Sequence, residues 1–116
     1  MATSKISEHE KTVLIDITNQ TNATAGTITY VKRGYVRQIN IVGVTYPNGS
    51  GTNPGYLTLP TIAEGDRPPD VTEGALHRAG DDQTMDIWIR ADGTFGLRNY
   101  DIGTGKIYGT LTWVIA

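Results

Sequence analysis

The stretch TMDIWIRADGTFGLR, residues 84–98, decides the fold of this chain. Apolar and polar residues alternate on both sides of Asp92-Gly93, a dipeptide typical of tight turns, and this pattern predicts a β-hairpin. A two-residue turn would mix charged and apolar side chains on each face, for example by placing Arg90 opposite Phe95. A three-residue loop over 91–93, with Gly93 left-handed at a bulge, separates the two kinds. We therefore expect the three-residue loop.

This register divides the hairpin into a core face and an outer face. The core face carries Met85, Ile87, Ile89, Phe95 and Leu97, with Ile89 opposite Phe95 and Ile87 opposite Leu97. The outer face carries Asp86, Trp88, Arg90, Thr94, Gly96 and Arg98. Trp88 then lies opposite Gly96, whose missing side chain leaves room for the indole to lie flat, and Asp86 faces Arg98.

The rest of the chain has the same two-residue period, with β-branched and aromatic residues between clusters of Gly, Asn and Pro. The other expected strands are Thr12–Ile17, Gly26–Lys32, Tyr35–Tyr46, Tyr56–Leu59, Gly74–Arg78 and Tyr108–Ile115, and the hairpin strands are Thr84–Arg90 and Phe95–Tyr100. No window combines good helix formers with helical apolar spacing, so we expect essentially no helix. The sequence predicts an all-β fold, a compact antiparallel Greek-key or jelly-roll-like barrel or sandwich.

Two loops and a tail frame the expected barrel. Prolines cannot donate ladder hydrogen bonds, so Pro60–Val71 is expected to be a loop, and Pro47–Gly55 is rich enough in turn residues to predict a mobile surface loop. Residues 1–11 are expected to form a flexible tail or stalk remnant, and residues 12–116 a single domain. Trp113 alternates with Thr112 and Val114 in the last strand, which favours a place in the core.

Composition excludes several classes of function. The 116 residues have a net charge of −2 and no basic tract, which argues against nucleic acid as a partner. The absence of cysteine excludes disulfides, thiolate metal sites and cysteine nucleophiles. No apolar run reaches the roughly 20 residues that a membrane helix needs, and the polar N-terminus does not resemble a signal peptide. We expect a soluble protein without membrane insertion.

The outer face of the hairpin is the candidate binding site. Aromatic rings pack against the apolar C–H face of a pyranose, and arginine and carboxylate groups bond to its hydroxyls. The predicted saccharide-binding residues are Trp88, Asp86, Arg90 and Arg98, with His77, Tyr100 and Asp101 as rim contacts. The same face would equally suit packing against a second sheet or a neighbouring subunit, with Trp88 as an interface anchor.

The sequence gives little support to catalysis. Serine occurs only at Ser4, Ser7 and Ser50, so an assembled nucleophile and base is not expected. Asp82 and Asp86 would flank a glycosidic bond only if the fold set their separation correctly. The aspartates at 81–82 lack a calcium-loop pattern, and two distant histidines make no zinc site. We expect a protein that is not an enzyme and requires no cofactor or metal.

Four motifs carry a resemblance to a known family: Tyr30–Val36, Leu59-Pro60 to Arg67-Pro68, Ile87–Thr94 and Gly109–Trp113. Over residues 25–116 the chain resembles the receptor-binding head domains at the tail-fibre and baseplate tips of tailed phages, especially those infecting Gram-positive bacteria. The resemblance implies a homotrimeric β-barrel that binds cell-envelope saccharide and belongs to the virion tail tip or baseplate. It also implies synthesis in the host cytoplasm and attachment to other tail or baseplate proteins through the N-terminus.

The chain departs from this family where Asp66 stands before Arg67 instead of an aromatic residue. We also expect no shoulder or neck before the head, so that the chain is either an excised head or attaches to its virion differently. A competing class is therefore a structural virion protein, a capsid decoration or head fibre with no saccharide receptor. A third alternative is a cellular lectin-like module.

Overall fold

The computed structural model describes residues 11–47, 57–80, 84–98 and 106–115. The strands are β1 (Thr12–Asp16), β2 (Ala25–Arg33), β3 (Val36–Thr45), β4 (Thr72–Arg78), β5 (Thr84–Ile89), β6 (Phe95–Arg98) and β7 (Ile107–Val114). Two single turns of 3-10 helix, η1 (Thr18–Gln20) and η2 (Glu64–Asp66), are the only helical elements in these ranges. The prediction of an all-β fold with essentially no helix is confirmed.

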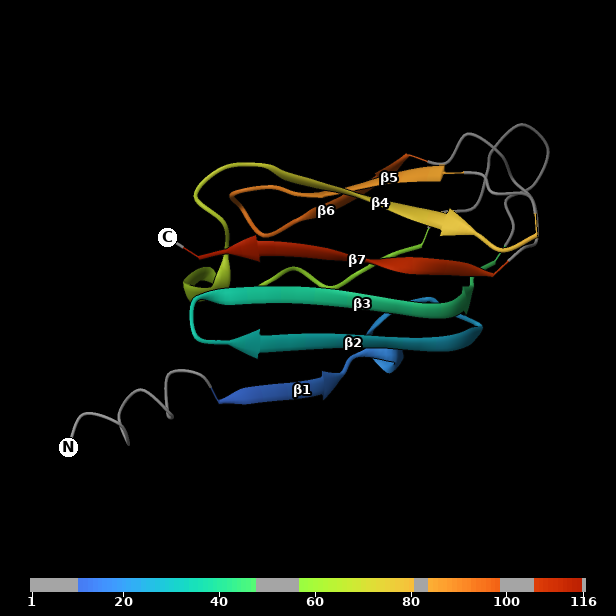
Figure 1. The fold of residues 1–116 in the computed structure, drawn as a ribbon, viewed down its shortest axis with the longest axis horizontal. Coiled ribbons are helices and arrows are strands. Elements are labelled where there is room, and N and C mark those ends of the chain that lie inside the picture. The colour runs from blue at the N-terminus through green and yellow to red at the C-terminus, as the bar shows by residue number, and fades with distance from the viewer. Residues whose placement is uncertain (1–10, 48–56, 81–83, 99–105, 116) are drawn as a thin grey trace.

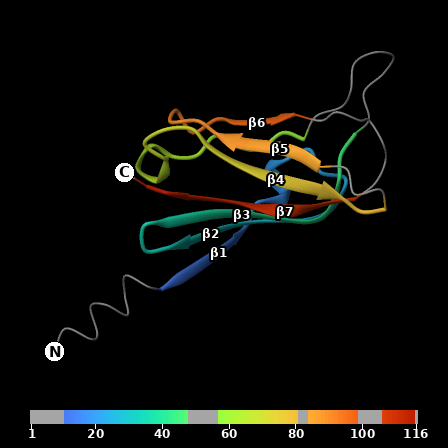
Figure 2. The same ribbon diagram turned by 45° about the horizontal axis from the view of Figure 1, so that its top comes forward.

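The strands form one seven-stranded sheet in the order β1-β2-β3-β7-β4-β5-β6, and every pair of neighbours is antiparallel (Figure 1). The sheet is curled into a half-barrel. β4, β5 and β6 lie on one side of the central strands β3 and β7, and β1 and β2 lie on the other (Figure 2). The two edges of the sheet, β1 and β6, are not joined to each other. The fold is therefore a barrel with one open side.

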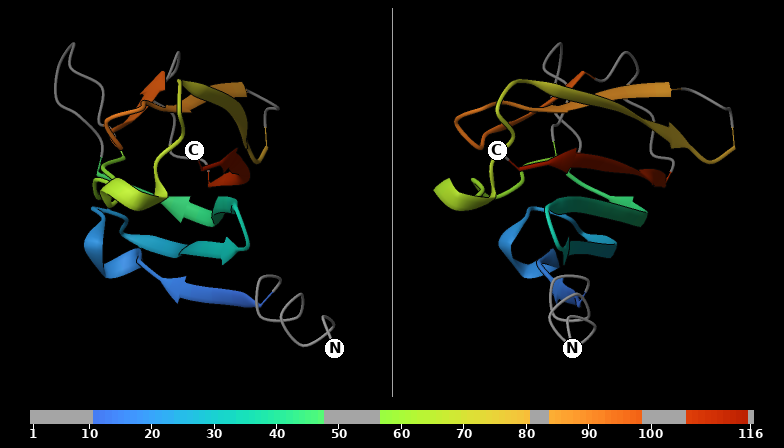
Figure 3. Two further views of the ribbon diagram at one scale, coloured as in Figure 1. Left: turned by 90° about the vertical axis from the view of Figure 1, so that its left-hand side faces the viewer. Right: turned by 60° about the vertical axis from the view of Figure 1, so that its left-hand side comes forward.

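The segment from Leu57 to Val71 runs along this open side (Figure 3). It is held at the β5–β6 loop by the Ile62 N–H, which donates to the Gly93 carbonyl at 3.0 Å. At the other end the Thr58 N–H donates to Oδ1 of Asn22, at 2.8 Å. Leu57 and Ile62 are buried and complete the core. The segment thus serves as the wall that the open sheet lacks.

The expected strand Tyr56–Leu59 is wrong for its described part, since Leu57–Leu59 has no regular secondary structure. Apolar and polar residues alternate here because Leu57 is buried, Thr58 is exposed and Leu59 is half-buried. The Thr58 N–H bonds to a side chain instead of a neighbouring strand. Pro60 then offers no backbone donor to a ladder. The predicted loop over 60–71 is confirmed, with η2 as a short turn within it.

The core lies between the inner face of the curled sheet and the 57–71 segment. Its fully buried side chains are Ile28, Ile39, Ile41, Val44, Leu76, Ile87, Ile89, Ile107, Leu111 and Trp113. Tyr30 stacks on Trp113 with ring centroids 6.2 Å apart, and Phe95 meets the same indole edge-on at 6.0 Å. Each buried aliphatic side chain contributes about 1.5–3 kcal/mol through burial. The predicted core position of Trp113 is confirmed.

The predicted hairpin is confirmed in detail. β5 and β6 pair Ile89 with Phe95 and Ile87 with Leu97, as expected for a three-residue loop. The Arg90 N–H donates to the Thr94 carbonyl at 2.9 Å, and the Gly93 N–H donates to the Arg90 carbonyl at 2.9 Å. Gly93 has a φ of 84°, in the left-handed region that glycine adopts without strain. Of the expected strand Phe95–Tyr100, the part after Arg98 lies outside the described residues.

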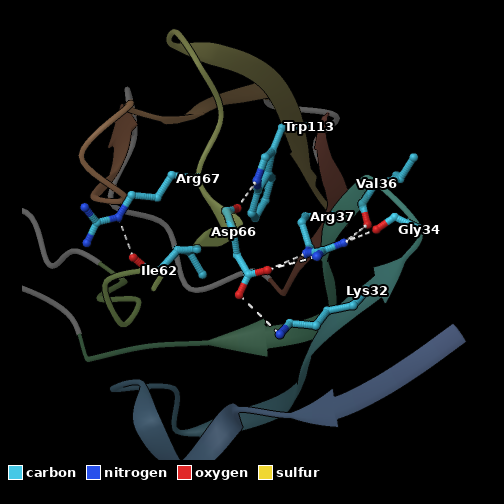
Figure 4. Close-up of polar contacts among 8 residues, drawn as sticks. All are labelled: Lys32, Gly34, Val36, Arg37, Ile62, Asp66, Arg67 and Trp113. Carbon is cyan, nitrogen blue, oxygen red and sulfur yellow. Dashed lines mark hydrogen bonds and ion pairs between the residues drawn. The ribbon is translucent and has the colours of Figure 1, made fainter. Parts of the chain in front are cut away.

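A polar anchor fixes the 57–71 segment to the sheet, and Asp66 is its centre (Figure 4). Both Nε and Nη2 of Arg37 lie 2.9 Å from Oδ1 of Asp66, and Lys32 Nζ lies 3.2 Å from Oδ2. The backbone carbonyl of Asp66 accepts a 2.8 Å hydrogen bond from Nε1 of Trp113. The residue that departs from the resembled family therefore joins the loop to β2, β3 and β7.

The anchor also sets the charge state of Asp66. Burial alone would raise the pKa of its carboxyl group, but the hydrogen bonds and charges of Arg37 and Lys32 together hold it below the ordinary value. Arg37 is itself buried and also donates through Nη1 to the carbonyls of Gly34 and Val36, at 2.8 and 2.9 Å. The charge of this buried arginine is thus paired with a carboxylate, and Nε, Nη1 and Nη2 all have a partner.

Candidate functional site

The outer face of the β5–β6 hairpin presents Trp88 as the sequence predicts. Trp88 lies opposite Gly96 in the register, and its indole covers this glycine so closely that a Cβ atom there would collide with Cε2, Cζ2 and Nε1 of the ring. The indole therefore lies along the sheet rather than standing away from it. Trp88 remains partly exposed, in contrast to the buried Trp113.

β4 adds residues to this face that the sequence did not reveal. Glu73 lies opposite Trp88, and Ala75 lies opposite Asp86, on the other side of β5 from β6. A hollow of about 210 Å³ is lined by Glu73, Gly74, Asp86 and Trp88. Because opposed residues in an antiparallel pair point to the same face, both carboxylates flank the indole. The hollow thus combines an aromatic surface with two acidic side chains.

Arg90 bounds the site at the hairpin end. The centre of its guanidinium lies 5.6 Å from the Trp88 ring centroid, a cation–π distance, and Nη1 lies 3.4 Å from Oγ1 of Thr94. Asp92 accepts hydrogen bonds from the Thr94 hydroxyl at 2.6 Å and the Thr94 N–H at 3.0 Å. These bonds hold the pKa of Asp92 below its ordinary value, so the loop presents a carboxylate beside an exposed arginine.

The remaining predicted residues are not all at this site. Arg98 lies opposite Asp86 in the β5–β6 register, as predicted. His77 is on the outer face of β4 but four residues from Glu73, roughly 13 Å along the strand. It stacks on Tyr108 of β7, with ring centroids 5.8 Å apart, and not on Trp88. Tyr100, Asp101 and Asp82 lie outside the described residues.

Glu73 is a residue of the candidate site that was not predicted from the sequence, although its position next to a predicted strand could have indicated it. It stands one residue before the predicted strand Gly74–Arg78, and β4 in fact begins at Thr72. The pairing of Glu73 with Trp88 depends on the register between β4 and β5, which the connecting loop sets. A hairpin assignment for β4 and β5 would have brought Glu73 to the indole.

This arrangement can hold a polar, ring-shaped molecule. The indole offers an apolar surface, the carboxylates of Glu73 and Asp86 accept from hydroxyl groups, and the Arg90 guanidinium donates to them. Within the described ranges no group of three or more His, Asp or Glu side chains is placed to hold a metal ion. No described helix is long and apolar enough to span a membrane.

Comparison of the sequence with protein-family models and with curated proteins finds no match.

Proposed function

We propose that this chain is a receptor-binding head domain of a tailed phage, which attaches to bacterial cell-envelope saccharide and performs no chemistry on it. The observation that supports the proposal most directly is the Trp88 indole lying along Gly96, with Glu73 and Asp86 on one side and Arg90 on the other. A flat aromatic ring with acceptors and a donor at its rim matches the two kinds of surface that a sugar ring presents.

We expect weak binding at each site. Hydrogen bonds to a sugar replace hydrogen bonds to water, so each contributes only about 0.5–1.5 kcal/mol net. A homotrimer would place three such sites on one head, and many heads on one virion would add avidity. The proposed partners are therefore a surface polysaccharide, two further copies of this chain, and tail or baseplate proteins attached through the N-terminus. The proposed location is the virion tail tip or baseplate.

The second candidate is a structural virion protein that decorates a capsid or forms a head fibre. The partly exposed position of Trp88 on the outer face of the sheet favours it, since such a tryptophan also suits packing against another protein. In that case Trp88 would anchor a protein interface and the chain would bind capsids instead of cell walls.

The test compares Trp88→Ala with Tyr35→Ala, a matched removal of an exposed aromatic residue from the β2–β3 turn, where Tyr35 is 65% exposed. Both variants and the parent protein are measured for binding to purified cell walls of candidate Gram-positive hosts, and for mass by light scattering. The proposal expects a trimer of about 38 kDa, three times 12.6 kDa, or a whole multiple of that mass, for all three proteins. Wall binding should be lost only in Trp88→Ala.

Two results would count against the proposal. If the parent protein binds no wall but binds capsids, the structural virion protein takes its place. If Trp88→Ala loses its oligomeric state together with wall binding, the outer face of the hairpin is a subunit interface and the sugar site lies elsewhere.

A further inference from the structure

Strand β1 is an edge strand with an unusual amount of exposed aliphatic surface. All five of its residues are exposed, and the three central ones, Val13, Leu14 and Ile15, are 42%, 68% and 37% exposed. Within the part of the chain that the structure describes, its backbone pairs with β2 along one side only. Exposed edges are usually protected by a lysine, a proline, a bulge or a covering loop. The pairing of β1 with β2 has no bulge, and Thr12–Asp16 contains neither lysine nor proline.

The opposite edge of the sheet is protected. β6 is four residues long and contains Gly96, which weakens a strand as a template. The segment that begins at Leu57 runs beside it, and its residues 57–59 and 61 line a common hollow with Thr94, Phe95 and Leu97. The unprotected edge is therefore a property of β1 and not of the open half-barrel in general.

A groove runs beside the inner face of β1. Its apolar wall consists of Ile15 and Ile17 on one side and Pro60 and Ile62 on the other, and the groove has a volume of about 210 Å³. A strand added to the edge of β1 would point every second side chain toward the face on which this groove lies. Aliphatic side chains at alternate positions are therefore the ones that fit.

The sequence of β1 supplies those side chains itself. We propose that two copies of this chain pair through their β1 edges, antiparallel, with Leu14 opposite Leu14 of the second copy. In this register Val13 lies opposite Ile15, and Thr12 lies opposite Asp16. Apolar side chains meet apolar ones, each threonine hydroxyl faces a carboxylate, and inner-face residues stay on the inner face.

Other registers fit less well. A shift by one residue would place inner-face residues opposite outer-face residues. A shift by two residues in one direction places Lys11 opposite Ile15 of the second copy. A shift by two residues in the other direction leaves Thr12 and Val13 opposite residues beyond the end of the partner strand. Only the register centred on Leu14 pairs all five residues of β1. This self-complementarity is why the occupant is a second copy rather than an unrelated strand.

The inferred contact is two-fold and goes beyond the proposed function, which involves three copies. A five-residue pairing buries less than the roughly 1,200 Å² of a standard interface, so the contact is weak in isolation. Joining two trimers would give six chains, about 76 kDa from 12.6 kDa each, and three such contacts would reinforce one another. Without a trimer, the product is a dimer of about 25 kDa from the same chain mass.

The absence of cysteine from the chain allows a register-specific test. In Leu14→Cys the two new thiols lie opposite each other, and mild oxidation should give a cross-linked dimer that reducing agent separates. Thr12→Cys is the matched control on the same strand and face. Its two thiols would be four residues out of register, roughly 13 Å along the strand, which exceeds the Cα separation of about 7 Å that a disulfide tolerates.

Sedimentation of the cysteine-free protein provides the second measurement. Leu14→Asp places two carboxylates opposite each other and should halve the parent mass, from six chains to three or from two to one. Val42→Asp, at a 56% exposed position on the outer face of β3, should leave the mass unchanged. Selective cross-linking of Leu14→Cys together with a halved mass in Leu14→Asp supports the pairing.

A parent protein that sediments as a single chain or as a trimer at every concentration overturns the inference. Equal cross-linking of both cysteine variants, or of neither, also overturns it. Wall binding is a separate readout, so a failure of the β1 contact leaves the saccharide proposal standing, and the reverse holds as well.

Discussion

Removal of the Asp66 side chain is the most direct test of how the open side of this barrel is held shut. In Asp66→Ala the buried guanidinium of Arg37 loses both of its 2.9 Å contacts with the carboxylate, and Lys32 loses its 3.2 Å contact. The hydrogen bond from Trp113 to the Asp66 carbonyl involves only the backbone and is still available. The substitution therefore isolates the charged part of the anchor.

The size of the effect follows from the exposure of each partner. Breaking a fully buried ion pair by removing one member costs about 3–5 kcal/mol. The Arg37 and Asp66 side chains are 10% and 18% exposed, so this pair lies near that limit, whereas the Lys32 side chain is 35% exposed and contributes little. Arg37 keeps its bonds to the Gly34 and Val36 carbonyls. We expect Asp66→Ala to lower the free energy of unfolding by about 2–3 kcal/mol.

Urea and thermal unfolding measure this loss, which corresponds to a decrease in Tm of about 10 °C for a domain of this size. Asp92→Ala is the matched control, because Asp92 also has a lowered pKa but is exposed and bonds only within its own loop. Its loss should be much smaller. A double variant with Arg37→Met should lose less than the sum of the single losses, since the unpaired guanidinium is then absent.

The pH dependence of the free energy of unfolding provides a second test of the Asp66 contacts. The pKa of Asp66 is lowered from its ordinary value of 3.8 in the folded state, so its contribution is present above that value and is lost as pH falls through the folded pKa. The difference in stability between the parent protein and Asp66→Ala should therefore narrow below about pH 4. A loss under about 0.5 kcal/mol at neutral pH, or a difference that does not narrow in acid, would refute the reasoning.

Two further substitutions test the core and the candidate site. The Tyr30 hydroxyl is buried without a hydrogen-bond partner, so Tyr30→Phe should leave stability at neutral pH unchanged or raise it by up to about 1 kcal/mol. Burial, with a smaller contribution from Asp66, raises the pKa of Tyr30 to about 12. The free energy of unfolding of the parent protein should therefore fall between pH 10 and 12, and this fall should be missing in Tyr30→Phe. A large loss of stability in Tyr30→Phe at neutral pH would contradict the unpartnered hydroxyl. Gly96→Ala places a methyl group where the Trp88 indole lies, so it should shift Trp88 fluorescence and abolish wall binding while changing stability by less than about 1 kcal/mol. Unchanged fluorescence would show that the indole does not lie along Gly96.

The parts of the fold that sequence predicts well are those fixed by local pattern. The 84–98 hairpin is one, because the alternation of residues and the position of Gly93 together leave a single register that separates the faces. The burial of Trp113 is another, since its neighbours at two-residue spacing are apolar. These predictions needed no information about distant parts of the chain.

The parts that sequence missed depend on distant partners. Leu57–Leu59 has the alternation of a strand, but its position is set by Asn22, which lies 36 residues from Thr58. Asp66 finds Arg37 at a separation of 29 residues, and nothing in the loop itself points to that arginine. Glu73 joins the candidate site only through the β4–β5 register. Contacts between residues so far apart in the chain cannot be predicted from the pattern of a short stretch of sequence.

The central place of β7 has a consequence for the order in which this chain folds. β1, β2 and β3 form one meander and β4, β5 and β6 form another, and β7 pairs with β3 on one side and with β4 on the other. Each meander is made of neighbours in sequence and so has a low cost of loop closure. The strand that joins them is synthesised after both. During translation the two halves therefore have no shared sheet until residues 107–114 leave the ribosome, and the continuous sheet can form only after that.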